Sequence, residues 1–308
     1  VAGLPDEDND GYPDVCNAVC LTTGMTVEPG GPWNLIGEYI DGSAARDRFG
    51  GAVAINSDGT IVAISAYTKD LPGPVQDVGE VQVWVWNGNQ WANRGQFMRG
   101  LLDNERFGDS IALSSNGNRI VIGAPLHNGR GRVVVMDWNN NAQIYEQKWA
   151  REGSNGSQSG YAVAISPDGN RIGIGEPFAA ITRGTVIIMD LSNINDVRQV
   201  GTTINGDVNS GSYNGYSIAL KNNGNTIAIG DPQFDGANTP DNGHVRIFDL
   251  QTNDAVQTWV QRGNDIEGTA AGDLSGTSID LSSDGNIVAI GSPDNDSGAT
   301  NSGHVRVF

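Results

Sequence analysis

Cysteine is almost absent from this sequence of 308 residues, in which Cys16 and Cys20 are the only two. An intracellular chain of this size ordinarily has several thiols spread through its core. A close pair followed by a cysteine-free body therefore favours an oxidising compartment and one local disulfide between Cys16 and Cys20. Two reduced cysteines that lie close together by chance are the alternative interpretation.

Basic residues and long hydrophobic runs are also scarce. The chain has 18 Lys and Arg against 36 Asp and Glu, which gives a formal net charge of -18. This balance argues against binding to nucleic acid or to an anionic membrane surface, because both need a basic patch. No apolar run approaches the ~18 residues that cross a bilayer, so we expect a soluble protein. Because it starts at Val1, we also expect a processed product. Sequons at Asn155 and Asn295 are compatible with secretion as a glycoprotein.

Glycine, by contrast, is abundant, with 43 residues, and it marks an internal repeat. One short segment occurs five times, with copies that begin at Phe49, Phe107, Ser159, Asn214 and Ser275. Each copy is followed by an Asp-Gly or Asn-Gly turn, a pair that favours tight hairpins. The turn glycines recur every 52 to 61 residues, at Gly59, Gly117, Gly169, Gly224 and Gly285.

Each repeat continues with three further elements. An apolar strand, expected to be buried on both faces, follows the turn at 61–64, 120–122, 172–174, 227–229 and 287–290. A third strand follows a glycine at Gly79, Gly131, Gly184, Gly243 and Gly303. A Trp-x3-Gly motif marks a fourth element at Trp33, Trp91, Trp149 and Trp259, whereas one copy has Val197 in place of Trp. Four short strands per unit, repeated five times, predict an all-β fold: a five-bladed β-propeller.

The order of the elements predicts how the ring closes. A fourth-strand motif at 33–40 precedes the first complete unit, while the last unit ends on its third strand at 303–308. Pairing these two segments would close the five-bladed propeller with an N-terminal strand and leave no long unpaired edge. The competing interpretation is a fragment of a larger ring. We assign 33–308 to the propeller and 1–32 to a separate N-terminal segment.

The repeat motifs resemble the FG-GAP class of propeller repeats, which occurs in the integrin α-subunit head and in many extracellular proteins. The resemblance rests on segments such as Phe107-Gly-Asp-Ser-Ile-Ala-Leu and Gly303-His-Val-Arg-Val, and it covers about residues 33–308. It implies a propeller in an extracellular setting, although propellers carry many activities. The integrin-type Asp-rich calcium loop is replaced here by a short Asp/Asn-Gly turn, so no calcium site is carried over to the blades.

A calcium loop is predicted instead at residues 6–17. Carboxylates at Asp6, Asp8, Asp10 and Asp14, with Gly11 at the sixth place, have the spacing of a calcium-binding loop. The segment resembles a thrombospondin type 3 repeat, an extracellular calcium-binding unit with disulfides. By that analogy the Ca²⁺ ligands would be Asp6, Asp8, Asp10, the main chain of Tyr12, Asp14 and Asn17. A disordered acidic tail is the alternative, and residues 21–32 are expected to be a linker.

The sequence offers no obvious catalytic constellation. His244 and His304 occupy the same repeat position, which indicates a structural role, and His127 has no partner in a zinc-like spacing. The carboxylates of a glycosidase would be sought among Asp109, Glu176, Asp231 and Asp280. We therefore predict that the protein is not an enzyme. The expected role is an extracellular or cell-surface adhesion or assembly module that binds proteins or copies of itself. A glycan-binding lectin is the alternative, and a glycosidase a weaker one.

Overall fold

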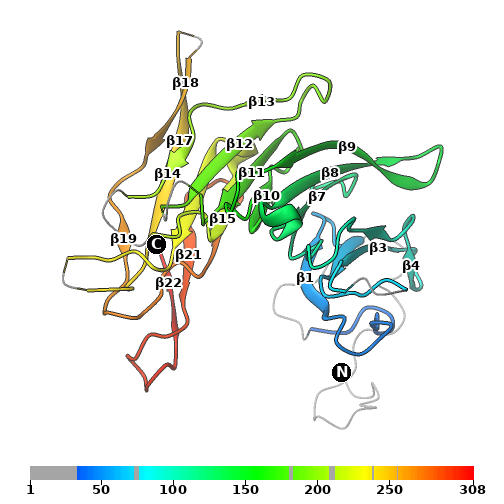
Figure 1. Ribbon diagram of the computed structural model, residues 1–308, viewed down its shortest axis with the longest axis horizontal. Helices are drawn as coiled ribbons and strands as arrows, with labels where there is room; N and C mark the ends of the chain where they lie inside the picture. Colours follow the sequence, from blue (N-terminus) through cyan, green and yellow to red (C-terminus); the bar gives the residue numbers. More distant parts are fainter. Residues whose placement is uncertain (1–32, 73–75, 180–182, 208–211, 238, 255) are drawn as a thin grey trace, which may run out of the picture.

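The computed structural model describes residues 33–308 apart from 73–75, 180–182, 208–211, 238 and 255. Strands account for 45% and helix for 2% of the protein. The strands form five antiparallel sheets arranged as a five-bladed β-propeller (Figure 1). The predicted fold class and number of blades are therefore confirmed. None of the described helices is long and apolar enough to cross a membrane.

Each blade is one sheet whose strands follow one another along the chain. The first blade contains β1 (Phe49–Ile55), β2 (Ile61–Ala66), β3 (Glu80–Trp86), β4 (Trp91–Asn93) and β5 (Met98–Arg99). The second contains β6 (Ser110–Leu113), β7 (Arg119–Ala124), β8 (Arg132–Asn139) and β9 (Ile144–Glu152). The third contains β10 (Ala162–Ile165), β11 (Arg171–Glu176), β12 (Thr185–Asp190), β13 (Arg198–Gln199) and β14 (Ile204–Asn205).

The fourth blade contains β15 (Ser217–Lys221), β16 (Thr226–Asp231), β17 (His244–Asn253), β18 (Val256–Gln261) and β19 (Ile266–Glu267). The fifth contains β20 (Ser278–Leu281), β21 (Val288–Ser292) and β22 (His304–Val307). Two 3-10 turns, η1 (His127–Gly129) and η2 (Asn222–Gly224), complete the described elements. The first strand of each blade lies innermost, and these inner strands contact one another in succession from β1 to β20.

The hydrophobic core lies in layers between blades, because the second strand of a blade is apolar on both faces. In β7, Ile120 and Ile122 pack toward the first blade, whereas Val121 packs toward the third. In β16, Ile227 and Ile229 pack toward the third blade. Alternation along a strand sends successive side chains to opposite faces, so a continuous apolar run supplies two layers at once. This confirms the prediction of burial on both faces for these strands, except at Ile287 of the fifth copy, which is 53% exposed.

Two of the repeated tryptophans, Trp149 and Trp259, pack at blade boundaries, whereas Trp91 packs within the first blade. Trp259 of β18 is 9% exposed, and its Nε1 donates to the carbonyl of Val200 in the third blade at 2.9 Å. Trp149 of β9 packs against the layer between the second and third blades. Trp91 of β4 packs beside Trp86, with ring centroids 5.5 Å apart.

The predicted closing strand is not formed among the described residues. Residues 33–48 contain no strand, and β22 pairs only with β21. The segment around Gly37 lies against the first blade instead, since Trp91 Nε1 donates to the carbonyl of Ile36 at 2.9 Å. Gly37 has a φ of +74°, which interrupts an extended conformation. The fifth blade therefore has three strands, with Val305 70% exposed, and the edge that residues 33–40 were expected to cover stays open in the described part of the chain.

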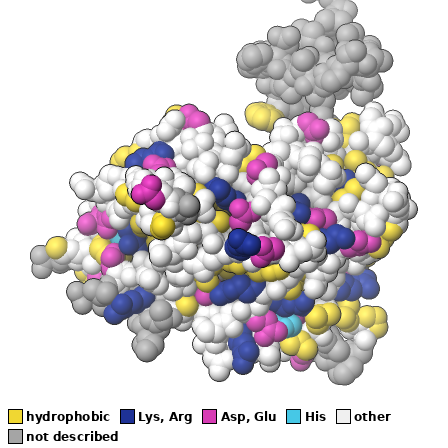
Figure 2. Space-filling view, turned by 90° about the horizontal axis from the view of Figure 1, so that it is seen from above, with side chains coloured by type: hydrophobic (Ala, Val, Ile, Leu, Met, Phe, Trp, Pro, Cys, Tyr) yellow, Lys and Arg dark blue, Asp and Glu magenta, His cyan; other side chains and the backbone are white. Residues whose placement is uncertain are grey.

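Charges of both signs are interspersed over one face of the molecule (Figure 2). On the face that Figure 2 shows, Lys and Arg side chains lie among Asp and Glu side chains instead of forming a separate basic patch. The charges on this face are therefore mixed in sign.

Candidate functional site

The five inner strands begin at equivalent tight turns, and these turns lie together at one end of the inner strands. In each turn a backbone N–H donates to the carbonyl oxygen three residues earlier. The donor and acceptor residues of the five turns, which we call the mouth ring, are Gly51 and Arg48, Asp109 and Arg106, Tyr161 and Gln158, Tyr216 and Tyr213, and Thr277 and Leu274. The repeat fixes this backbone while the side chains differ from blade to blade. Variable side chains on a rigid frame are where recognition and catalysis are usually found.

Asp109 is the one carboxylate of the mouth ring, and the charges of two mouth-ring arginines act on it. Burial raises the pKa of Asp109 above its ordinary value, and the charges of Arg106 and Arg48 partly oppose that rise. Arg48 is positioned by Tyr67, because its Nη1 donates to the Tyr67 hydroxyl at 2.6 Å. A carboxylate with a raised pKa beside guanidinium groups is a common arrangement at sites of proton transfer.

Aromatic side chains form the neighbouring part of the mouth ring. The rings of Tyr161 and Tyr216 lie 4.8 Å apart, and those of Phe178 and Tyr213 are also 4.8 Å apart. Phe178 lies 6.1 Å from Tyr161, so the four rings are contiguous. Burial, a hydrogen bond to Tyr216 and the charge of Asp109 all raise the pKa of Tyr161, which keeps its phenol protonated. Aromatic faces and protonated hydroxyls together suit a polyhydroxylated ring.

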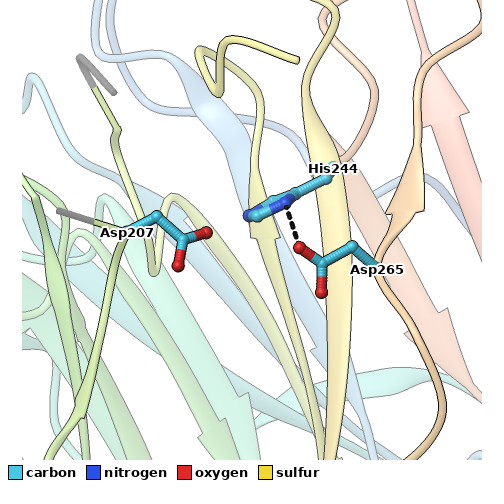
Figure 3. A group of neighbouring side chains, drawn as sticks. All are labelled: Asp207, His244 and Asp265. Carbon is cyan, nitrogen blue, oxygen red and sulfur yellow. Dashed lines mark ion pairs between the residues drawn. The ribbon is translucent and has the colours of Figure 1, made fainter. Parts of the chain in front are cut away.

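A second polar cluster lies at the boundary between the third and fourth blades. His244 opens β17, Asp265 precedes β19, and Asp207 follows β14 (Figure 3). One ligating atom from each of the three lies within 4.8 Å of the others, so this cluster has the composition and spacing to hold a metal ion. Asp231 connects this cluster to the mouth ring. The backbone N–H of Tyr213, a mouth-ring residue, donates to Asp231 at 2.7 Å, and Asp231 faces His244.

The four carboxylates proposed from the sequence have separate surroundings. Asp109 lies in the mouth ring, whereas Glu176 at the end of β11 pairs with Arg151. Asp231 accepts a hydrogen bond from Ser212, and burial raises its pKa. Asp280 of β20 is 71% exposed and lies beside Lys221 of β15. The glycosidase alternative needs two facing carboxylates, and these four have different partners.

Two of the other sequence interpretations change in the structure. His127, for which the sequence offers no cysteine or histidine partner, has two carboxylate neighbours instead: it contacts Glu105 through Nδ1 and lies 3.5 Å from Glu152 through Nε2. Asn295 is 1% exposed and donates to Thr269 Oγ1 at 3.1 Å, so its burial is incompatible with glycosylation of the folded chain. Asn155 is exposed, and its side-chain oxygen accepts from Arg130 at 2.8 Å.

The calcium loop and the cysteine pair lie outside the described residues. Asp6, Asp8, Asp10, Tyr12, Asp14 and Asn17, with Cys16 and Cys20, all belong to 1–32. Their assignments stay predictions.

A groove of about 520 Å³ lies between the outer parts of the first and second blades. Arg94 lies in it, 4.4 Å from the Trp138 ring centroid, and donates to the Tyr145 hydroxyl at 2.8 Å. Arg94 therefore holds the two blades together. The other residues that line the groove are Val85, Asn93, Gly95, Asn140 and Gln143, which include no acid or base. The mouth ring, which contains an acid and two arginines, is therefore a better candidate for a catalytic site than this groove.

Comparison with known proteins returns likeness in structure alone. No family description matches the chain, and no curated protein matches its sequence. Among solved structures, the periplasmic gluconolactonase of Pseudomonas aeruginosa superposes with a TM-score of 0.53 at 14% identity, covering 83% of this chain and 70% of that one. Candidate 6-phosphogluconolactonases from Bacteroides uniformis and Bacteroides fragilis give TM-scores of 0.51 and 0.52 at 13% identity. They cover 83% and 84% of this chain, and 70% and 66% of theirs.

These neighbours contradict the prediction of a non-catalytic adhesion module. Three of the solved structures that share the arrangement of strands are named as a gluconolactonase or 6-phosphogluconolactonases, and the mouth ring contains an acid, two arginines and tyrosines that lie far apart in the sequence. The expectation failed because it was based on the absence of a linear catalytic motif, whereas a propeller builds its site from turns of several blades. At 13–14% identity the likeness establishes the fold.

Proposed function

We propose that this protein is a hydrolase of small cyclic esters of the sugar-lactone class, acting at the mouth ring. The observation that carries the proposal is Asp109, a half-buried carboxylate of the mouth ring whose pKa burial raises and the charges of Arg106 and Arg48 lower, and whose own charge raises the pKa of Tyr161. The names of the neighbouring solved structures support the choice of a lactone over other esters. The FG-GAP relationship read from the repeats is retained as a proposal about the class of propeller.

The chemistry required is the addition of water to a ring carbonyl. Asp109 would accept a proton from a water molecule, and the resulting hydroxide would add to the carbonyl carbon. Arg106 and Arg48 would stabilise the negative charge that develops on the carbonyl oxygen. The bond between that carbon and the ring oxygen then breaks, and the proton held by Asp109 returns to the alkoxide that leaves. Tyr161, which stays protonated, is placed to donate a hydrogen bond to the substrate, and the open-chain hydroxy acid is released.

The test is proton release from gluconolactone and from 6-phosphogluconolactone, corrected for their spontaneous hydrolysis. We expect saturable turnover of at least one of them. Arg106→Gln should lower kcat/KM by about 10²-fold, the effect of removing one donor to a developing oxyanion. Arg198→Gln, which changes an exposed arginine paired with Asp196 outside the mouth ring, is the matched control and should leave the rate unchanged. Absence of turnover on both lactones, or equal rates in the two variants, would refute the proposal.

We further propose that the protein works outside the cytoplasm and binds Ca²⁺ at residues 6–17. The close cysteine pair and the spacing of the acidic residues support both statements. The periplasmic location named for one structural neighbour agrees with them.

The calcium loop has its own test. Asp10→Ala removes the central carboxylate of the loop, so we expect high-affinity Ca²⁺ binding to be lost in calorimetric titration, while the melting temperature of the propeller changes little. Asp70→Ala, an acidic residue in the loop after β2 of the first blade, serves as the control and should leave the titration as in the wild type. A calcium isotherm that Asp10→Ala leaves intact would mean that residues 6–17 are not the site.

A further inference from the structure

The cluster of Asp207, His244 and Asp265 has a feature that an ordinary buried histidine lacks. The His244 side chain is wholly buried, yet among the described residues neither Nδ1 nor Nε2 has a partner in hydrogen-bond geometry. Asp265 Oδ2 lies 3.2 Å from Nδ1, and Asp231 Oδ2 lies 3.7 Å from Nε2, but neither contact has hydrogen-bond geometry. A buried polar group without a partner is costly, so two unpaired nitrogens in one ring need an explanation.

The ring is held firmly in this position. Phe234 stacks on His244 with centroids 3.9 Å apart and planes 12° from parallel. Backbone pairing of His244 with Asp231 on one side and with Glu267 on the other fixes the start of β17. The nitrogens therefore keep their directions, with Asp265 and Asp207 on either side of the ring in Figure 3.

Charge in the cluster is also unbalanced. Three carboxylates, from Asp207, Asp231 and Asp265, lie near the imidazole, and among the described residues Arg246 is the one Lys or Arg in contact with them, with Nη1 3.6 Å from Asp207 Oδ1. The carboxylates of the cluster therefore outnumber its arginine, and a divalent cation bound among them would reduce that excess of negative charge.

We propose that this cluster is a binding site for a divalent transition-metal ion such as Zn²⁺, held by one ring nitrogen of His244 and by one oxygen each of Asp265 and Asp207. Imidazole with two carboxylates suits Zn²⁺ and related ions, whereas Ca²⁺ takes oxygen ligands alone. Asp231 would orient the ring, and Arg246 would hold Asp207, as outer partners do at metal sites. Because the Asp207 and Asp265 side chains are 44% and 29% exposed, the ion has a route from solvent and room for a water ligand.

The site belongs to one blade boundary and is not a property of the repeat. The residues equivalent to His244 in the other blades are Glu80, Arg132, Thr185 and His304. In the fifth blade His304 pairs across the strands with Ser292, where the fourth blade has Asp231. His304→Ala is thus a matched control that removes a histidine from the same repeat position without touching a carboxylate cluster. Since Asp207 comes from the third blade and His244 from the fourth, the bound ion would also join the two blades.

The experiment is a Zn²⁺ titration by calorimetry on the full chain, stripped of metal and kept in excess Ca²⁺ so that residues 6–17 do not contribute. We expect one equivalent of Zn²⁺ per chain, a rise in melting temperature when it binds, and a visible Co²⁺ spectrum when Co²⁺ replaces it. His244→Ala should weaken Zn²⁺ binding by about 100-fold or more and abolish the Co²⁺ band. His304→Ala should leave both unchanged.

If His244→Ala fails to fold, Asp207→Asn provides the same test at a partly exposed position and should also weaken the binding of Zn²⁺. No Zn²⁺ bound by the wild type, or binding that neither His244→Ala nor Asp207→Asn reduces, would overturn the proposal. The readout is metal binding and not turnover, so the site stands or falls independently of lactone hydrolysis.

Discussion

Gly131→Ala is expected to reduce the free energy of unfolding by about 3 kcal/mol or more. A loss of this size is typical of substitutions that place an atom where the buried structure has no space. A Cβ at Gly131 would lie 2.2 Å from the backbone nitrogen and 2.4 Å from the carbonyl oxygen of Ser159 in the next blade. These are backbone atoms of the turn that starts the third inner strand, and a parallel bridge joins Gly131 to Ser159, so neither side can move freely. The left-handed φ of +81° adds about 1–2 kcal/mol for a residue with a Cβ. Urea denaturation measures the difference.

Gly129→Ala is the matched control, two residues away in the same loop. Gly129 also has a left-handed φ, +66°, but no atom lies within 4 Å of its would-be Cβ. We therefore expect it to lose only the conformational part, about 1–2 kcal/mol. Equal losses in the two variants would show that the close approach between blades does not limit stability.

Gly131 illustrates which features of the fold the sequence could predict. Gly79, Gly131, Gly184 and Gly243 recur before the third strand, and each has its would-be Cβ within 2.3 Å of the next blade's backbone. A repeated steric requirement leaves a repeated residue, so the blades, their turns and their buried second strands were all readable from periodicity. The closing strand was misread because residues 33–40 carry the motif of a fourth strand, but Gly37 and the Trp86–Trp91 pair draw the segment to the first blade.

The candidate site was harder to predict because it depends on where the copies differ. From the sequence, Asp109 is one of four candidate acids. Arg48 and Arg106 are not among the candidates, because no sequence motif relates these arginines to Asp109. When the five turns are aligned, the residue that accepts the turn hydrogen bond is Arg, Arg, Gln, Tyr and Leu in successive blades. This variation at a position where the backbone is repeated is the sequence signal that indicates a site. His244 was read as structural because His304 shares its place. What separates them is the cross-strand partner, Asp231 in one blade and Ser292 in the other.

Asp109→Asn is expected to reduce turnover of a lactone by about 10²–10⁴-fold, the contribution of a positioned general base. Asparagine has nearly the same shape but cannot accept the proton of water. Because burial raises the pKa of Asp109, the wild-type kcat/KM should rise with pH through a value above the ordinary range of an aspartate, and this limb should be missing from the residual activity of the variant. Steady-state rates across the acid range measure both effects.

The same substitution should stabilise the protein, which separates a functional role from a structural one. A carboxyl whose pKa is raised by folding favours the folded state at pH values below its unfolded pKa, and that contribution is lost as pH rises through the folded pKa. At neutral pH the wild type therefore holds a charge that burial disfavours, and Asp109→Asn should melt at a higher temperature there but not at low pH. Asp280→Asn, 71% exposed on β20, should change neither rate nor melting temperature. A residue that costs stability at the pH where its carboxylate would act is expected to be retained for activity. A lower melting temperature with unaltered turnover in Asp109→Asn would instead assign this aspartate to the fold.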